Sequence, residues 1–193
     1  DRLREIGVEI VDIDDINDEG LLFDDSHIAP IVEKFRAEGV DGIMLCHANF
    51  GTEYVCARLA RELGLPVLLW GPRDERPEPD GTRLRDSQCG LFATGKVLRR
   101  FQVPFTYMTN CRLTDPEFER GVWDFLAVCN VVKTFKHPRI LQMATRPFDF
   151  WSTMCNEGEL LEKFNIQLAP IPMPELTDEV KKAKAACRWL SAP

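Results

Sequence analysis

The sequence contains no long apolar run, and this excludes a helix that spans a membrane. No stretch approaches the ~18 consecutive apolar residues that such a helix needs. Basic residues are also few, because the formal net charge is −7 and Lys and Arg form no dense cluster. Phosphate binding needs such clusters, so nucleic acid is excluded as a general partner. Nothing near the N-terminus resembles a secretory signal, and we expect a cytoplasmic protein.

Several residues and motifs that carry common chemistries are missing or scarce. There is no GxGxxG, no P-loop and no GxSxG, which disfavours a Rossmann dinucleotide site, a nucleotide-phosphate loop and a hydrolase elbow. The three histidines share no short metal-ligand spacing with a carboxylate. No pair among the seven cysteines has CxxC spacing, which is typical of reduced thiols in a cytosolic protein. We therefore expect no metal site and no disulfide framework in this chain.

What the sequence does contain is an alternation of apolar runs and amphipathic stretches. Strands separated by helices favour a parallel sheet covered on both faces. The predicted fold is therefore α/β, a three-layer αβα arrangement of Rossmann or flavodoxin type with a mainly parallel sheet. The expected strands are 8–13, 42–46, 66–70, 104–108, 139–144 and 166–172. The expected helices are 28–38, 52–63 and 158–164, with three more that begin after caps at Ser87, Thr114 and Thr177.

A break at His137-Pro138 divides the chain into two expected domains. Residues 1–136 form a first α/β domain, whose first strand is expected to precede residue 1 because the opening residues read as the end of a helix capped by Gly7. Residues 137–193 form the start of a second α/β domain. Its last helix is expected to bury Val180, Ala183, Cys187 and Leu190.

Ligand sites in parallel sheets lie in the loops that leave the carboxyl ends of strands. In the first such loop, His47 and Asn49 can bond hydroxyl groups, and Phe50 offers an apolar face to a sugar ring. The alternative is structural: Thr52 or Asn49 caps the next helix, and His47 bonds a nearby carbonyl. Both interpretations stay open at this point.

Two further loops carry candidate residues. Arg73 with Asp74 could bind a polar ligand or pair across a subunit contact, in a loop long enough to be functional. The carboxylates of this loop do not predict a metal site, because prolines and a glycine break their spacing. In the third loop, Arg146 precedes Phe148 and two more aromatics. This pattern suits a carbohydrate or a partner surface, or alternatively a core plug beneath a domain junction.

The order of these loops resembles the N-terminal region of the L-fucose/L-arabinose isomerase family. The stretch GIMLCHANFGTEYVCARLAREL looks like that family's strand, polar loop and helix, and LPVLLWGPRDE like its next strand and substrate-side loop. The stretch RILQMATRPFDFW, followed by GELLEKFNIQLAPIPMPEL, looks like the entry to the second domain. The resemblance covers most of residues 8–182, and the ordered set carries it rather than any single motif.

The resemblance implies a metal-dependent isomerase that interconverts an aldose and a ketose. The family uses a divalent metal, commonly manganese, and an ene-diol route in which metal and carboxylates stabilise charge while a proton moves between carbons. Those ligands and catalytic carboxylates lie downstream in the family, so this chain is expected to hold none of them. Alone it is expected to be inactive, and it would supply a wall of the substrate pocket. Matched by position, the candidate monosaccharide-binding residues are Asn49, Phe50, Arg73, Arg146 and Phe148, with His47 beside them.

The resemblance also implies a homo-oligomer, a trimer or hexamer, formed through the N-terminal domain over a neighbour's active site. The first loop mixes fucose-type and arabinose-type patterns, so the sugar stays open. Two other classes of function share features of this pattern. A non-catalytic sugar-binding module of periplasmic or regulator type shares the strand and helix alternation. A flavodoxin-like module is disfavoured because no phosphate-cradling loop is present.

Overall fold

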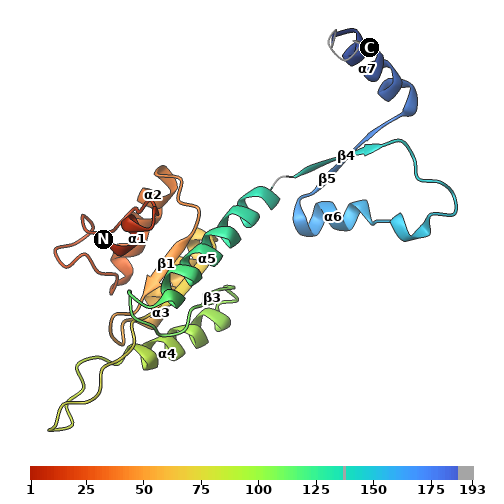
Figure 1. The fold of residues 1–193 in the computed structure, drawn as a ribbon. Helices are drawn as coiled ribbons and strands as arrows, with labels where there is room; N and C mark the ends of the chain where they lie inside the picture. The colour runs from red at the N-terminus through yellow and green to blue at the C-terminus, as the bar shows by residue number, and fades with distance from the viewer. Residues whose placement is uncertain (137, 187–193) are drawn as a thin grey trace, which may run out of the picture. The chain divides into compact units, whose positions relative to one another are not determined.

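The computed structural model describes residues 1–136 and 138–186, which divide into two compact units. The first unit is Asp1–Val131 and the second begins at Val132 (Figure 1). The predicted break at His137 and the predicted inward positions Cys187 and Leu190 lie outside the described residues. Within the described chain, no helix combines the length and the apolar character needed to cross a membrane.

The first unit is built on a parallel sheet of three short strands. They are β1 (Ile43–Cys46), β2 (Val67–Trp70) and β3 (Thr106–Tyr107), in the order β1-β2-β3. The two longer strands pair in register from Ile43 opposite Val67 to Cys46 opposite Trp70. Every residue of β2 is buried, as expected for a central parallel strand covered on both faces. The predicted parallel sheet is therefore confirmed.

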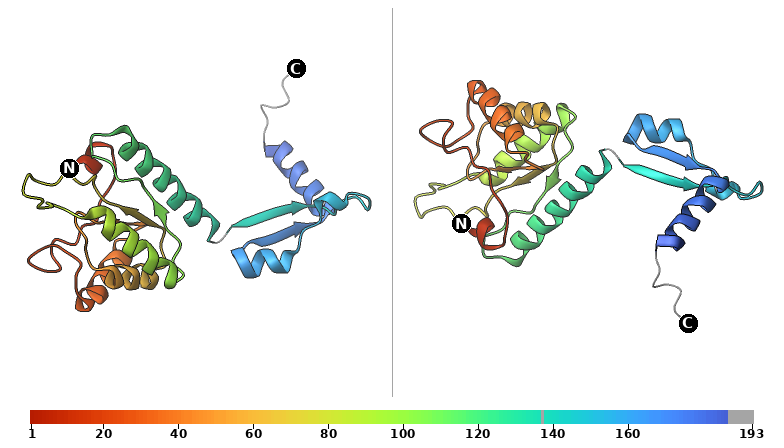
Figure 2. Two further views of the ribbon diagram at one scale, coloured as in Figure 1. Left: turned by 90° about the horizontal axis from the view of Figure 1, so that it is seen from below. Right: turned by 90° about the horizontal axis from the view of Figure 1, so that it is seen from above.

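Helices cover both faces of this sheet, and this confirms the three-layer αβα fold (Figure 2). The helices α3 (Glu53–Leu63) and α4 (Ser87–Arg100) pack on the face that carries Leu45 and Leu69. The opposite face, which carries Leu68 and Trp70, packs against α5 (Pro116–Phe135) and residues near α1 (Arg2–Glu5). The helix α2 (Ile28–Ala37) follows the short helix η1 (Asp25–His27) and packs on α3.

The first unit corrects two sequence predictions. Residues 8–13 form no strand, and the amide of Val8 instead donates to the carbonyl of Leu3, which closes the end of α1. The helix expected to be capped by Thr114 begins at Pro116, so Asp115 occupies the capping position. The Asp115 carboxylate accepts from the amide of Arg112 and fixes the turn before the helix.

The second unit is a single strand–helix–strand crossover followed by a helix. Its elements are β4 (Arg139–Met143), the short helix η2 (Trp151–Thr153), α6 (Glu157–Phe164), β5 (Gln167–Ile171) and α7 (Met173–Ala186). The two strands are parallel, with Gln142 opposite Pro170. Bonds from the Gln167 amide to the Pro138 carbonyl and from the Ala144 amide to the Ile171 carbonyl extend the ladder.

The second unit has little interior. Among its described residues, only Ile166 is buried, whereas Leu141 and Met143 of β4 are more than half exposed. The predicted inward position Val180 is exposed, and so is Ala183. Thr177 does not cap α7, because the helix begins four residues earlier and the Thr177 hydroxyl donates to the Met173 carbonyl.

Candidate functional site

The loop after β1 is built around a buried histidine. The His47 amide donates to the Trp70 carbonyl and so continues the ladder beyond β1. The imidazole is 4% exposed, and its Nδ1 lies 3.0 Å from the Phe50 carbonyl oxygen. Because a carbonyl oxygen only accepts, Nδ1 carries the proton and Nε2 presents a lone pair. Within the described chain this buried Nε2 has no hydrogen-bond partner.

Burial keeps this imidazole neutral. It lowers the pKa of His47 below the ordinary value of 6.5, although the bond to the Phe50 carbonyl acts in the opposite direction. The alternative in which His47 bonds a nearby carbonyl is therefore what the structure shows. Thr52 occupies the N-cap position of α3, as one alternative predicted, but it makes no side-chain cap bond, and Asn49 bonds the amides of Phe50 and Asp86 instead.

Glycines allow the loop to pack this closely. Gly51 has φ of +75°, and a Cβ there would lie 2.6 Å from Nδ1 of His47. A Cβ on Gly90 of α4 would lie 2.1 Å from the Phe50 carbonyl oxygen. The backbone of the loop after β1 therefore packs directly on the start of α4, and a side chain at Gly51 or Gly90 would displace the loop.

Asn49 ties the first loop to the second. Its Oδ1 accepts from the amide of Phe50 at 2.9 Å and from the amide of Asp86 at 3.0 Å. Asp86 directly precedes α4, so one amide side chain joins the loop after β1 to the end of the loop after β2. The ring of Phe50, 40% exposed, lies at the surface beside this junction.

Asp74 supplies the cap of α4 from the other end of the second loop. Its two carboxylate oxygens accept from the amides of Ser87 and Gln88 at 2.9 and 3.0 Å, although Asp74 lies 13 residues before Ser87. Partial burial acts to raise the pKa of Asp74, but the bonds from these amides outweigh it and the pKa is lowered. Ser87, predicted as the cap, is the first helical residue.

Arg73 places an exposed positive charge at the edge of the sheet where the loops after β1 and β2 begin. Its guanidinium lies 3.7 Å from the Asp115 carboxylate, and its amide donates to the Cys111 carbonyl. The side chain of Arg73 is 60% exposed, so the ion pair leaves donors open to solvent. Arg73 thus lies at the carboxyl end of β2, next to the loop that follows β3.

The loop after β3 was missed by the sequence analysis. Nδ2 of Asn110 donates to the carbonyls of Gly71 and Pro72, and Oδ1 of Asn110 accepts from the Tyr107 hydroxyl. The Trp70 indole donates to the sulfur of Cys111. A polar residue two positions after the expected strand 104–108 was the available signal, because parallel strands end at one edge of their sheet.

The third candidate loop belongs to the second unit and is structured by its own contacts. Nη1 of Arg146 donates to the carbonyls of Pro147 and Phe148 at 3.0 and 2.7 Å. The indole of Trp151 donates to the same Phe148 carbonyl at 2.9 Å. Phe148 is 85% exposed and Phe150 54%, so neither ring is buried inside the second unit.

The structure therefore brings four of the six predicted site residues to one edge. His47, Asn49, Phe50 and Arg73 lie in loops that leave the carboxyl ends of β1 and β2, and hydrogen bonds join these loops to each other and to α4. Arg146 and Phe148 lie in the second unit. Within residues 1–136 and 138–186, no three His, Cys, Asp or Glu side chains are grouped in a way that could hold a metal ion.

This edge belongs to a part of the chain that matches a known family. The model of the fucose/sulfoquinovose isomerase N-terminal domain matches residues 1–136, which is more than half of the sequence. The chain belongs to this isomerase family. No curated protein matches the sequence. The match covers the first unit and the whole of α5, and it confirms the resemblance of this region to the fucose isomerases. The third candidate loop lies outside the matched residues.

Proposed function

We propose that this chain supplies one wall of the monosaccharide pocket in a cytoplasmic aldose–ketose isomerase of L-fucose or L-arabinose type. The observation that carries the proposal is the edge at which the loops after β1, β2 and β3 meet. There Asn49 bonds the amide of Asp86, and Asn110 bonds the carbonyl of Gly71. A sugar needs an apolar face and several hydroxyl partners, and such a rigid edge can supply both.

Each candidate residue has a distinct role in this proposal. The exposed ring of Phe50 packs against the C–H face of the sugar, and the guanidinium of Arg73 donates to its hydroxyls. His47 is a positioning residue, since its buried ring holds the Phe50 carbonyl. Asn49 fixes the same loop through Oδ1 and retains its Nδ2 for a hydroxyl. Arg146 and Phe148 complete the candidate set in the second unit.

The metal of the proposed reaction is Mn²⁺, which stabilises charge on adjacent sugar oxygens when it is bound. The described residues do not fit such an ion, because no three candidate ligands are grouped. The proposal therefore gives this chain no metal ligand and no catalytic carboxylate. It also includes a trimer or hexamer formed through the first unit, in which the loop edge faces a neighbouring subunit.

The proposal is tested with the full natural chain, Mn²⁺ and a panel of aldoses that includes L-fucose and L-arabinose. Arg73→Ala should raise KM about tenfold and change kcat less, because a charge-assisted hydrogen bond contributes ~1.5–3 kcal/mol. Arg76→Ala is the matched control, since Arg76 lies exposed in the same loop. Equal KM values for the two variants, or no turnover of any aldose, would contradict the proposal. Binding of a monosaccharide without turnover, measured by calorimetry, would favour the non-catalytic module instead.

A further inference from the structure

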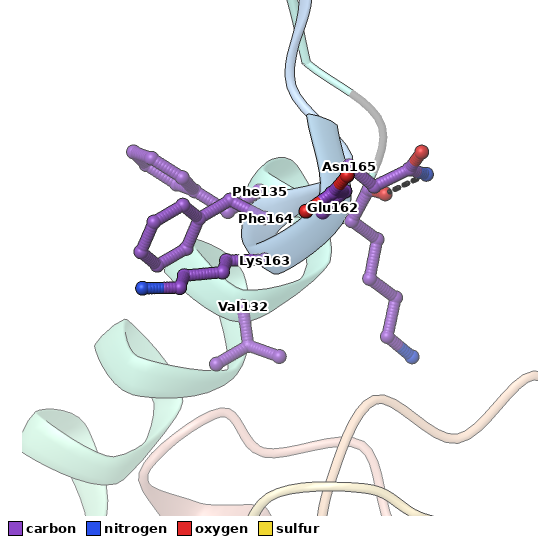
Figure 3. A pocket seen from close by; sticks show the side chains of 7 residues that line it. Val132, Phe135, Glu162, Lys163, Phe164 and Asn165 are labelled. Carbon is purple, nitrogen blue, oxygen red and sulfur yellow. Dashed lines mark hydrogen bonds between the residues drawn. The ribbon is translucent and has the colours of Figure 1, made fainter. Parts of the chain in front are cut away.

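Two exposed cations differ in how firmly the chain holds them. Lys163 lines an open groove in the second unit, where α5 and α6 end, together with Phe164 (Figure 3). Lys163 pairs with Glu159, but the two side chains are 64% and 48% exposed, and such a surface pair contributes little. Arg73 is about as exposed, yet the loop after β3 holds it at three points. The loop edge of the first unit, rather than the groove, therefore has the order that recognition of a small ligand needs.

The loop after β3 fixes both the backbone and the side chain of Arg73. Nδ2 of Asn110 donates to the carbonyl of Pro72, the residue before Arg73, at 3.4 Å. The amide of Arg73 donates to the carbonyl of Cys111 at 3.3 Å. Nη2 of Arg73 lies 3.7 Å from Oδ2 of Asp115. The guanidinium therefore has a defined place beside a carboxylate.

Asp115 is itself held in place. Its Oδ2 accepts from the amide of Arg112 at 2.9 Å, and its own amide donates to the carbonyl of Arg112 at 3.0 Å. The side chain of Asp115 is 27% exposed, against 60% for Arg73. A separation of 3.7 Å is longer than a direct hydrogen bond, so the N–H groups of Arg73 remain available to a ligand.

The other feature of this edge that attracts anions is also occupied. The N-terminus of a helix favours phosphate and carboxylate groups, and α4 begins at this edge. The amides of Ser87 and Gln88 already donate to the carboxylate of Asp74. The carboxylates of Asp74 and Asp115 thus face the two positive features of the edge. A ligand that brought a further negative charge would be repelled by both, whereas the hydroxyl groups of a neutral sugar would not.

We propose that Asp115 is a specificity-determining residue that restricts this site to neutral sugars. It acts through Arg73, whose guanidinium it positions for sugar hydroxyls, and it repels sugars that carry a carboxylate or phosphate group. Without Asp115, the guanidinium of Arg73 would favour such anions, because its parallel N–H groups match their paired oxygens. This role rests on the sugar site proposed above and adds the charge class of its substrate.

The variant Asp115→Asn separates the charge of Asp115 from its place in the fold. It removes the charge but retains an oxygen that can accept from the Arg112 amide, so the turn before α5 should stay intact. Binding is measured by calorimetry on the full natural chain, with L-fucose and L-arabinose as neutral sugars and D-galacturonate as the anionic one. The wild type should bind the better neutral sugar at least about tenfold more tightly than D-galacturonate, and Asp115→Asn should reduce this ratio at least about tenfold. Asp115→Glu retains the charge and should keep the wild-type ratio.

Glu117→Gln is the matched control, because it removes one negative charge at an exposed position two residues further on. It should keep the wild-type ratio, and Asp115→Asn should have no further effect on the ratio when Arg73 is already replaced by Ala. The proposal is overturned if Asp115→Asn binds like the control, if its effect persists in the Arg73→Ala background, or if the chain binds none of the three sugars.

Turnover of aldoses is a separate readout. An unchanged ratio with normal turnover contradicts only the role of Asp115. Absent turnover with the expected change of ratio contradicts only the isomerase proposal.

Discussion

At the scale of single residues, His47 combines burial with an unused acceptor. Its Nδ1 holds the Phe50 carbonyl, and its Nε2 lone pair is buried without a partner in the described chain. Protonation would place a second N–H at that buried position with nothing to accept it. Charging this ring therefore opposes folding.

This arrangement predicts a pH dependence of stability. Because the folded pKa of His47 is lowered, the unfolded chain binds a proton more readily, and stability falls as the pH drops below about 6.5. The free energy of unfolding should then fall by up to ~1.4 kcal/mol per pH unit from this one group. The free energy of unfolding, measured by urea unfolding at several values between about pH 5 and 8, should change less steeply with pH for His47→Gln than for the wild type. A His27→Gln variant retains His47, so its free energy of unfolding should depend on pH as in the wild type. If the two variants showed the same pH dependence, the assignment to His47 would be refuted.

At the scale of secondary-structure elements, the start of α4 depends on a residue far from it in the chain. Asp74→Ala removes both bonds to the first amides of the helix, and it should lower the free energy of unfolding by ~1–2 kcal/mol. Asp86→Ala is the matched control. Asp86 occupies the capping position but makes no side-chain cap bond, so its loss should change stability by less than about 0.5 kcal/mol. Urea midpoints that rank the two variants in the reverse order would contradict this account.

The elements also show what sequence reasoning can reach. The strands β1 and β2 were predictable because a buried parallel strand needs a continuous apolar run, and 42–46 and 66–70 are such runs. The predicted strand 8–13 is wrong, because an apolar run forms a strand only where a neighbouring strand bonds it. The cap from Asp74 was unpredictable, since no local pattern reveals the path of the loop that brings it back to Ser87.

The candidate site was predictable in the same partial way. His47, Asn49, Phe50 and Arg73 were found because the ends of parallel strands meet at one edge, which follows from topology alone. Asn110 was missed because β3 is only two residues long and its apolar signal is weak. The bond from Asn49 to Asp86 depends on side-chain geometry, which no spacing in the sequence encodes.

At the scale of the whole molecule, the two units differ sharply in how much they bury. The first unit has continuous apolar clusters on both faces of its sheet, and in the second only Ile166 is buried among the described residues. Local stability follows such burial. Amides of β4 and β5 should therefore exchange with deuterium far faster than those of β1 and β2, measured by mass spectrometry on the chain of residues 1–193. Equal protection in the two sheets would show that the second unit gains its stability in another way.

The register of β5 limits how its sheet can grow. Gln167 donates across to Pro138, and Ile171 accepts from Ala144, so alternate residues from 167 to 171 face β4. Pro170 therefore faces the outer edge, and proline has no N–H to offer there. Another strand that adds along this edge forfeits a ladder bond at that position. A single proline thus protects the sheet against edge-to-edge aggregation, and the side of β4 is the more favourable one for extension.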